Sequence, residues 1–423
     1  MGLAAAVAAP AVVLRLLGVR VGDELALLLF GSAVVAAAFL LTWAAEASEV
    51  DISGSLAIAL LALIAVLPEF AVDLYFAFTA GSRKSYAAYA AANMTGSNRL
   101  LIGFGWSLVA LLFVAAARLR ARRNRQRDRR RRLRRRAHAA AVTCVHLWPE
   151  NRIELGFLAL ASLYAVAIPL TRKLAWYDAV VLVGLFALYM WRTGRAEHGE
   201  PDLIGVAASL AALAAARRRA TVIALFCAAA LVVLAAAKPF AEGLIGTGRH
   251  LGIDEFLLVQ WLAPLASEAP ELLVATMFAL RGNGAKGVGT LLAAEVNQWT
   301  LLVGALPLAY LAGGGHGGLP LDARQNAEFI LTSAQAVLGF AVLLNLRLHR
   351  WEALTMLALF AVQFALPSPA ARTVLALAYL ALGAGILVTQ RHWLPGIARV
   401  LLHPGREQRE PEPEPLPETA TAS

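Results

Sequence analysis

The sequence predicts an all-α polytopic membrane protein with about 11 transmembrane helices, arranged as two inverted five-helix repeats with an extra C-terminal span. Three observations predict this fold. The 423-residue chain is 59% hydrophobic and 16% charged, with a mean hydropathy of +0.65, which excludes an ordinary soluble domain. Apolar runs that reach or approach the ~20 residues needed to cross a bilayer recur along the chain. Two of these runs, five spans apart, carry the same Pro-Glu pair.

The expected spans follow from the apolar runs and the Gly, Pro and Arg residues that bound them. They lie near residues 24–45, 54–80, 86–117, 153–170, 176–191, 220–245, 255–280, 287–311, 327–346, 351–366 and 373–389. An odd offset of five spans between the two Pro-Glu copies gives the second copy the opposite orientation, so the repeats are inverted. Inverted repeats place a substrate site at their interface and allow alternating access.

The domain organisation is predicted from the same pattern. We expect an N-terminal interfacial segment (1–23), a first five-helix repeat (24–195) with an Arg-rich loop (118–137), and a linker (196–219). A second five-helix repeat (220–368), an extra transmembrane helix (369–392) and a disordered tail (393–423) follow. The first segment is short and carries Arg15, which favours an interfacial helix over a span.

Basic residues predict the orientation. With this span count, the tract from Arg118 to Arg136 and most other clustered arginines fall on one face, which the positive-inside rule makes cytoplasmic. We therefore expect a multi-pass inner-membrane protein whose Arg-rich loop and C-terminus are cytoplasmic and whose loop contacts anionic lipid. The tract has no interleaved aromatic residues and adjoins a span, so the net charge of +10 does not indicate nucleic-acid binding.

Carboxylates inside spans mark the candidate site, because they are costly in a bilayer unless they face water or a partner. Pro68 precedes Glu69, and Asp73 lies four residues later on the same helical face. In the later span, Pro270 and Glu271 follow Ser267 and Glu268. Each proline frees a backbone carbonyl beside a carboxylate, and hard cations such as calcium and sodium prefer such oxygens. The alternative is a kinked helix whose Glu snorkels or pairs with Arg.

The span after each Pro-Glu pair is also polar. The residues singled out as further oxygen donors are Asn93, Ser97 and Asn98 in the first repeat, and Glu295, Asn297 and Gln298 in the second. The segments end in similar sequences, RLLIG and TLLVG. Interhelical packing by these amides and hydroxyls is the alternative interpretation.

At these residues the sequence resembles the sodium/calcium exchanger family of the cation/calcium antiporter superfamily. The paired repeats of that family read roughly GTSLPE in one helix and GNxxGSNxFN in the next; here LPE ends at Glu69 and GSN at Asn98. The resemblance covers ten of the expected spans. It implies a secondary active antiporter in which Glu69 and Glu271 are the central cation ligands, with Ser97, Asn98 and Ser267 beside them.

The sequence also departs from the family pattern. Ala65 and Val66 replace hydroxyl residues before the first LPE, and the second GSN is absent. These losses leave exchange of a cation for protons open beside exchange of calcium for sodium. Arg99 follows GSN directly, and its guanidinium could pair with Glu268, Glu295 or Asp73; a permanent pair would give a transport-inactive or channel-like relative.

An enzyme is not expected, because no His and carboxylate spacing typical of a catalytic metal occurs. We expect no cofactor, only transported ions such as Ca²⁺, Na⁺ or H⁺. The two cysteines, Cys144 and Cys227, lack the paired spacing of a metal or redox motif.

Overall fold

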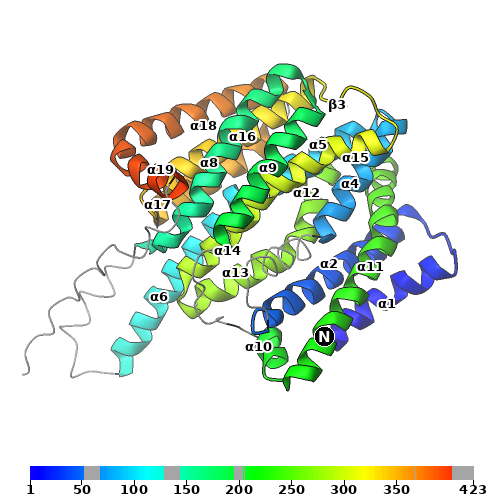
Figure 1. Ribbon diagram of the computed structural model, residues 1–423, viewed down its shortest axis with the longest axis horizontal. Coiled ribbons are helices and arrows are strands. Elements are labelled where there is room, and N and C mark those ends of the chain that lie inside the picture. Colours follow the sequence, from blue (N-terminus) through cyan, green and yellow to red (C-terminus); the bar gives the residue numbers. More distant parts are fainter. Residues whose placement is uncertain (52–66, 128–142, 195–202, 204, 367, 403–423) are drawn as a thin grey trace, which may run out of the picture.

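The computed structural model describes all residues except 52–66, 128–142, 195–202, 204, 367 and 403–423, and nearly all of the described chain is helical (Figure 1). The α-helices are α1 (Gly2–Leu16), α2 (Asp23–Ser48), α4 (Leu67–Ser82), α5 (Tyr86–Arg99), α6 (Ser107–Arg127), α8 (Arg152–Thr171), α9 (Trp176–Thr193), α10 (Gly205–Ala211), α11 (Ala215–Leu251), α12 (Glu255–Ser267), α13 (Ala269–Arg281), α14 (Gly284–Asn297), α15 (Val303–Ala312), α16 (Ala323–Leu343), α17 (Arg350–Val362), α18 (Pro369–Gln390) and α19 (Leu394–Leu402). The 3₁₀ turns are η2 (Pro149–Asn151), η4 (Gln363–Ala365) and η5 (Arg391–Trp393).

Two π-helical segments interrupt corresponding long helices. The segment η1 (Leu100–Trp106) joins α5 to α6, and η3 (Gln298–Leu302) joins α14 to α15. The segment η1 contains the last four residues of RLLIG, and η3 contains the first three residues of the similar sequence TLLVG. A π-helical turn inserts an extra residue into the helical repeat and is frequently found at functional sites. The sequence did not predict these turns.

Seven helical stretches in the described part of the chain are long and apolar enough to cross a membrane. They are Asp23–Ser48, Tyr86–Ala121, Pro149–Thr171, Ala215–Leu251, Gly284–Ala312, Ala323–Leu343 and Pro369–Leu402. Of the other expected spans, most of the first half of 54–80 lies outside the described residues, and 255–280 is broken at Glu268. Helices α9 and α17 occupy the places of 176–191 and 351–366 but fall short of the same criteria.

The helices extend beyond three of the expected boundaries. Helix α6 runs to Arg127, so the first part of the predicted Arg-rich loop is helical. Helix α11 begins at Ala215 inside the predicted linker. The predicted disordered tail begins with α19, whose apolar residues pack on α8, whereas the rest of the tail, 403–423, lies outside the described residues.

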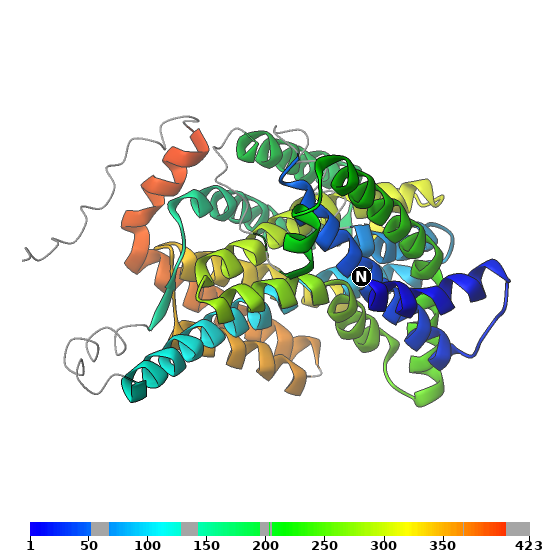
Figure 2. The same cartoon turned by 90° about the horizontal axis from the view of Figure 1, so that it is seen from below.

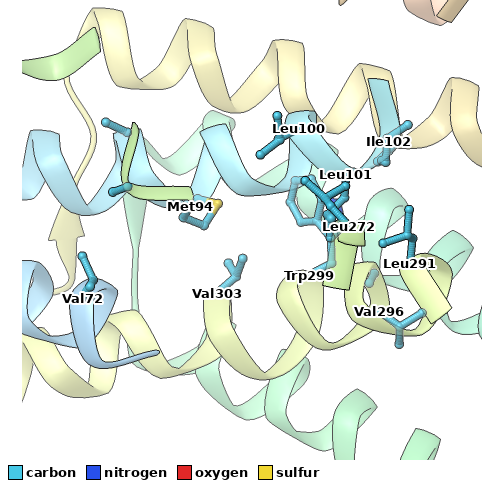
Figure 3. Close-up of a cluster of buried hydrophobic side chains, with 14 of the residues drawn as sticks. Val72, Met94, Leu100, Leu101, Ile102, Leu272, Leu291, Val296, Trp299 and Val303 are labelled. Atoms are coloured by element: carbon cyan, nitrogen blue, oxygen red, sulfur yellow. The ribbon is translucent and has the colours of Figure 1, made fainter. Parts of the chain in front are cut away.

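The helices form one bundle with α2 and α11 packed together on one side and α16 and α18 packed together on the other. Figures 1 and 2 separate these two pairs in both views. Helix α1 packs on α2 and α11 at the first side. Between the two sides lies an apolar core around η1 and η3, drawn in Figure 3. Its side chains include Met94, Leu101 and Ile102 from the N-terminal half of the chain, and Leu291, Val296 and Trp299 from the C-terminal half, all fully buried.

Short two-stranded sheets connect loops that are distant in sequence. Strand β1 (Cys144–His146) pairs antiparallel with β4 (Arg347–His349), and β2 (Lys173–Leu174) pairs antiparallel with β3 (Leu319–Pro320). At another loop, Arg218 at the start of α11 holds Asp51 through two hydrogen bonds of 2.6 and 2.7 Å. These bonds lower the pKa of Asp51 to about 2, so the pair stays ionised at neutral pH.

Candidate functional site

The centre of the site is the break between α12 and α13. Helix α12 ends at Ser267, Glu268 adopts a bent backbone, and α13 starts at Ala269 with Pro270 in its first turn. Proline is favoured there because the first turn of a helix needs no N–H donor from it. Pro264 lies inside α12 without ending it. Across the break the Glu268 N–H donates to Pro264 O at 2.8 Å and the Leu272 N–H donates to Glu268 O at 3.0 Å. Pro270 has no N–H, so the Ala266 carbonyl between Glu268 and Pro264 lacks its usual helical donor.

The N-terminal half of the chain contributes Glu69 to the same place. Glu69 lies in the first turn of α4 and is 5% exposed, and its carboxyl group interacts directly with that of Glu268. The amide of Gln298, at the start of η3, donates to Glu268 Oε1 at 2.6 Å and also interacts with Glu69. Residues from the two halves of the chain thus meet here, although Glu69 and Glu268 are 199 residues apart in the sequence.

Three more acidic residues surround this contact. Asp73 and Glu271 lie close enough to Glu69 for their charges to interact, and Glu295 lies within similar reach of Glu69. Asp73 and Glu295 are fully buried. Asn93 on α5 lies against Asp73. Five carboxyl groups are therefore gathered where helices from the two halves of the chain meet.

Many of the oxygens here have no hydrogen-bond partner although they are buried. An unpaired buried oxygen is costly, so each is expected to have a partner in some state of the protein. A hard cation is the partner that carboxylate, amide and hydroxyl oxygens suit. The unpartnered side-chain oxygens among the predicted site residues belong to Glu69, Asp73, Asn93, Ser97, Asn98, Glu271, Glu295, Asn297 and Gln298.

Two of the predicted ligands, Ser267 and Asn98, also donate hydrogen bonds to nearby backbone carbonyl groups. The Ser267 hydroxyl donates to the carbonyl oxygens of Ala263 and Pro264, each at 3.3 Å, and the Asn98 amide donates to Met94 O at 2.8 Å. Both still offer oxygen lone pairs. Within the described ranges, no three His, Cys, Asp or Glu side chains converge as a ready-made metal cage. A cation here would need amide, hydroxyl or backbone oxygens as well.

Arg99 corrects one expectation. Its guanidinium does not pair with Glu268, Glu295 or Asp73 but with Glu328 on α16, at 2.6 Å. Both side chains are almost completely buried. The π-helical turns begin directly after Arg99, and its side chain extends toward α16 and lies over the Trp261 ring at 5.0 Å. Arg99 therefore does not neutralise the central carboxyl groups.

Sequence reasoning missed Glu328 and Gln260 as partners of the site helices. Gln260 on α12 donates to Glu328 Oε2 at 3.1 Å and to the Thr95 hydroxyl at 3.3 Å. Glu328 is an acidic residue within an expected span, the same signal that identified Glu69. Glu328 is the second residue of the expected span 327–346, and a charged residue in that position usually marks the end of a span.

The comparisons with known proteins agree with this geometry. The family described as sodium/calcium exchanger protein matches residues 25–194 and 221–367. This chain belongs to that family. The match covers both sets of helices that supply the site and lies within the cation/calcium antiporter superfamily, as the LPE and GSN motifs indicated. The superfamily is one of antiporters rather than of enzymes.

Solved structures extend this family assignment to the fold. The H⁺/Ca²⁺ exchanger CAX is 38% identical to this exchanger-family chain, with 94% of this chain and 96% of that chain covered and a TM-score of 0.84. The Ca²⁺/H⁺ antiporter protein YfkE is 14% identical, covers 90% and 100%, and has a TM-score of 0.56. The sodium-calcium exchanger NCX_Mj is 19% identical, covers 84% and 99%, and has a TM-score of 0.50. A search of curated proteins found no match.

Proposed function

We propose that this member of the family is a calcium antiporter that binds its cation between Glu69 and Glu271 and works by alternating access. The single observation that carries the proposal is the group of buried, unpartnered oxygens brought together from α4, α5, α13 and α14. Calcium is coordinated by six to eight such oxygens. The family membership and the 38% identity to an H⁺/Ca²⁺ exchanger support calcium as the cargo.

Protons are the counter-ion that the geometry favours. Glu69 and Glu268 are in direct side-chain contact, and two carboxyl groups at that separation share a proton when no cation is present. A calcium ion that takes these oxygens releases the proton, and a returning proton releases calcium. Binding of the two ions is then mutually exclusive, which is what obligatory exchange requires. Sodium, the counter-ion in the family name, is the second candidate, because the same oxygens suit it.

Three features support two inverted five-helix repeats and about 11 membrane-crossing helices. The π-helical segments η1 and η3 interrupt the third and eighth expected spans. Gly96 on α5 contacts the backbone of Gln260 on α12, and Gly313 after α15 contacts the backbone of Phe78 on α4. In each proposed repeat, the second site helix therefore packs against the first site helix of the other repeat. The two-fold relation between the proposed repeats also converts the strand pair β1–β4 into the pair β3–β2.

The faces of the bundle are proposed from the same count. The β1–β4 sheet and the end of α6 lie on the face of the basic tract, and the β2–β3 sheet lies on the other face. We place the basic face in the cytoplasm of a cell with an inner membrane, against anionic lipid. The proposed division of the chain is unchanged apart from the helix boundaries given above. It consists of an interfacial segment (1–23), a first repeat (24–195), a linker (196–219), a second repeat (220–368) and an extra transmembrane helix (369–392).

The test is calcium uptake into proteoliposomes that contain the purified protein. An outward proton gradient and an outward sodium gradient are applied in turn, and uptake is followed with a calcium dye. We expect uptake under the proton gradient. Glu69→Gln and Glu271→Gln are each expected to reduce uptake at least 100-fold, because a neutral amide cannot supply the charge that balances Ca²⁺.

Glu150→Gln, a change of the same kind at an exposed residue outside the helices that form the site, is the matched control. It should transport as the wild type does. Uptake under sodium alone would replace protons by sodium as the counter-ion. Normal transport by either central variant, or no calcium uptake under either gradient, would contradict the proposed site or cargo.

A further inference from the structure

A second buried charge cluster lies outside the cation site, and Glu328 is its hub. Glu328 Oε2 forms an ion pair with Arg99 at 2.6 Å and accepts a hydrogen bond from Gln260 at 3.1 Å, while Glu328 Oε1 forms an ion pair with Arg372. The three partners come from α5, α12 and α18, and Glu328 itself is on α16. Glu328 and Arg99 are at most 1% exposed and Arg372 is 9% exposed. One carboxylate thus ties four helices together.

Further hydrogen bonds leave the cluster well ordered. The Arg99 guanidinium donates to Gln363 Oε1 at 2.8 Å and to Thr95 O at 3.1 Å, and Gln335 donates to Arg99 O at 3.1 Å. Arg372 donates to Leu366 O at 3.1 Å. Charge-assisted bonds of this kind are stronger and more directional than neutral ones. The cluster therefore holds its helices in one relative position.

The cluster is not itself a cation site. Two guanidinium groups face one carboxylate, so its net charge is +1, which repels a cation. Beyond Arg372 lies a hollow of about 210 Å³ lined by Asp254, Leu257, Arg324, Pro369 and Arg372. In that hollow Arg324 is paired with Asp254 at 2.6 Å. The acidic groups around the cluster are thus already matched by arginines.

Two of the tied helices carry predicted cation ligands. Arg99 directly follows Ser97 and Asn98 on α5, and Gln260 lies eight residues before Glu268, about 12 Å along α12. The two helices cross in close contact, because a Cβ on Gly96 would overlap the Gln260 carbonyl. A shift of either helix at the cluster would therefore move ligands at the site. Productive ion sites tolerate displacements of only about 0.5 Å.

We propose that Glu328 is a positioning residue for cation binding: with Arg99, Arg372 and Gln260 it fixes the α5–α12 crossing so that Ser97, Asn98 and Glu268 hold binding geometry. The inference rests on the proposed function for its transport readout but not for its structural one. Helix α18, outside the two repeats, supplies Arg372 and thereby takes part in setting the geometry of the site.

The experiment compares Glu328→Gln with Glu328→Asp, which keeps the charge, and with Asp178→Asn. Asp178 is a suitable control because it is a buried, hydrogen-bonded carboxylate that caps α9 and accepts from Tyr164 at 2.7 Å. Each protein is purified in full length. Hydrogen exchange is measured without calcium in residues 86–99, 255–267 and 176–193, and calcium uptake gives the KM for Ca²⁺ and the maximal rate.

We expect Glu328→Gln to raise hydrogen exchange in 86–99 and 255–267 but not in 176–193, and to raise the KM for Ca²⁺ about tenfold with less than a twofold change in maximal rate. Glu328→Asp should restore most of the affinity. Asp178→Asn should leave the KM unchanged. An unchanged KM together with unchanged exchange in α5 and α12 would overturn the proposal.

Two outcomes separate this proposal from the proposed function. If the wild type transports no calcium, the function fails, and hydrogen exchange in α5 and α12 alone decides whether Glu328 positions them. If Glu328→Gln does not fold, Arg372→Gln, which removes one partner and leaves the Arg99 pair, takes its place. An Arg372→Gln protein with wild-type KM and wild-type exchange in both helices would also overturn the proposal.

Discussion

At the scale of single residues, the protein treats buried charge in two opposite ways. The carboxylates around Glu69 retain buried oxygens without a hydrogen bond, whereas Glu328 forms ion pairs with Arg99 and Arg372 and accepts a hydrogen bond from Gln260. An unpaired buried oxygen costs on the order of 1–3 kcal/mol, and removal of one partner from a buried ion pair costs more. The difference separates a site that exchanges its ligands from a cluster that keeps them.

Gly96 is the residue at which the α5–α12 crossing can be tested most directly. A Cβ there would overlap the carbonyl of Gln260, a backbone group that cannot rotate away. Gly96→Ala is expected to lower the midpoint of thermal unfolding by several degrees and to weaken calcium uptake, because overpacking of about 1–3 kcal/mol must be relieved by helix separation. The measurement is thermal unfolding in detergent followed by the uptake assay.

Gly184→Ala on α9 is the matched control, because a Cβ at that position meets no atom within 4 Å. Alanine is the better helix former, so this variant should be as stable as the wild type or slightly more stable. Equal unfolding midpoints for the two variants would show that α5 and α12 do not depend on close contact at Gly96.

Single residues also show where sequence reasoning reached its limit. The sequence singled out Glu69 and Glu271, because a carboxylate beside proline in mid-span has few structural explanations. The partner of Arg99 was not predictable, since the choice among Asp73, Glu268, Glu295 and Glu328 depends on which way a long side chain leaves its helix. That direction depends on packing of α5 against α16, which no local pattern encodes.

At the scale of elements, irregular helices form the site. Helix α12 stops at Ser267. The π-helical segment η1 begins directly after Arg99, and η3 begins directly after Asn297. Irregular backbone at membrane depth is tolerated where it is buried in protein or lines a wet cavity. Prolines predicted the first irregularity. Nothing in RLLIG or TLLVG predicts a π-helix, because its cause is the surrounding packing.

Helix α19 gives a prediction for an element that the sequence assigned to a disordered tail. Its last carbonyl groups, of Val400 and Leu401, accept from Arg192 at the end of α9, the former at 2.7 Å. A cation at the C-terminus of a helix satisfies unpaired carbonyls and its dipole. Arg192→Gln is therefore expected to release α19 and to increase tryptic cleavage after Arg399 several-fold.

The readout is limited proteolysis followed by mass spectrometry of the cleavage products. Arg217→Gln serves as the control, since Arg217 is an exposed arginine at the start of α11. It should leave cleavage after Arg399 unchanged. Equal cleavage in wild type and Arg192→Gln would mean that burial of Ile397 and its apolar neighbours against α8, rather than the Arg192 cap, holds α19.

At the scale of the whole molecule, the two small sheets are consistent with the proposed two-fold relation between the repeats. Strand β1 follows the third expected span and pairs with β4 after the ninth, whereas β3 follows the eighth and pairs with β2 after the fourth. Exchange of the repeats converts one pairing into the other. Paired strands must lie on the same face, so each sheet fixes the relative sides of two loops far apart in sequence.

This relation predicts labelling from opposite sides of the membrane. In a background with Cys144→Ala and Cys227→Ala, Lys173→Cys in β2 should react with a membrane-impermeant maleimide in intact cells. Arg347→Cys in β4 should react only after the membrane is opened, because its face carries the basic tract that the positive-inside rule places in the cytoplasm. Both side chains are exposed, so access depends on the side alone.

The paired strands supply internal controls for this experiment. Pro320→Cys faces Lys173 across one sheet and should label as Lys173→Cys does, and His146→Cys faces Arg347 across the other and should label as Arg347→Cys does. Agreement within each pair and difference between pairs would support an odd number of spans between the loops, as the inverted repeats require. Labelling of all four positions in intact cells would contradict the count of spans, and labelling of only Arg347→Cys and His146→Cys would keep the count but reverse the orientation.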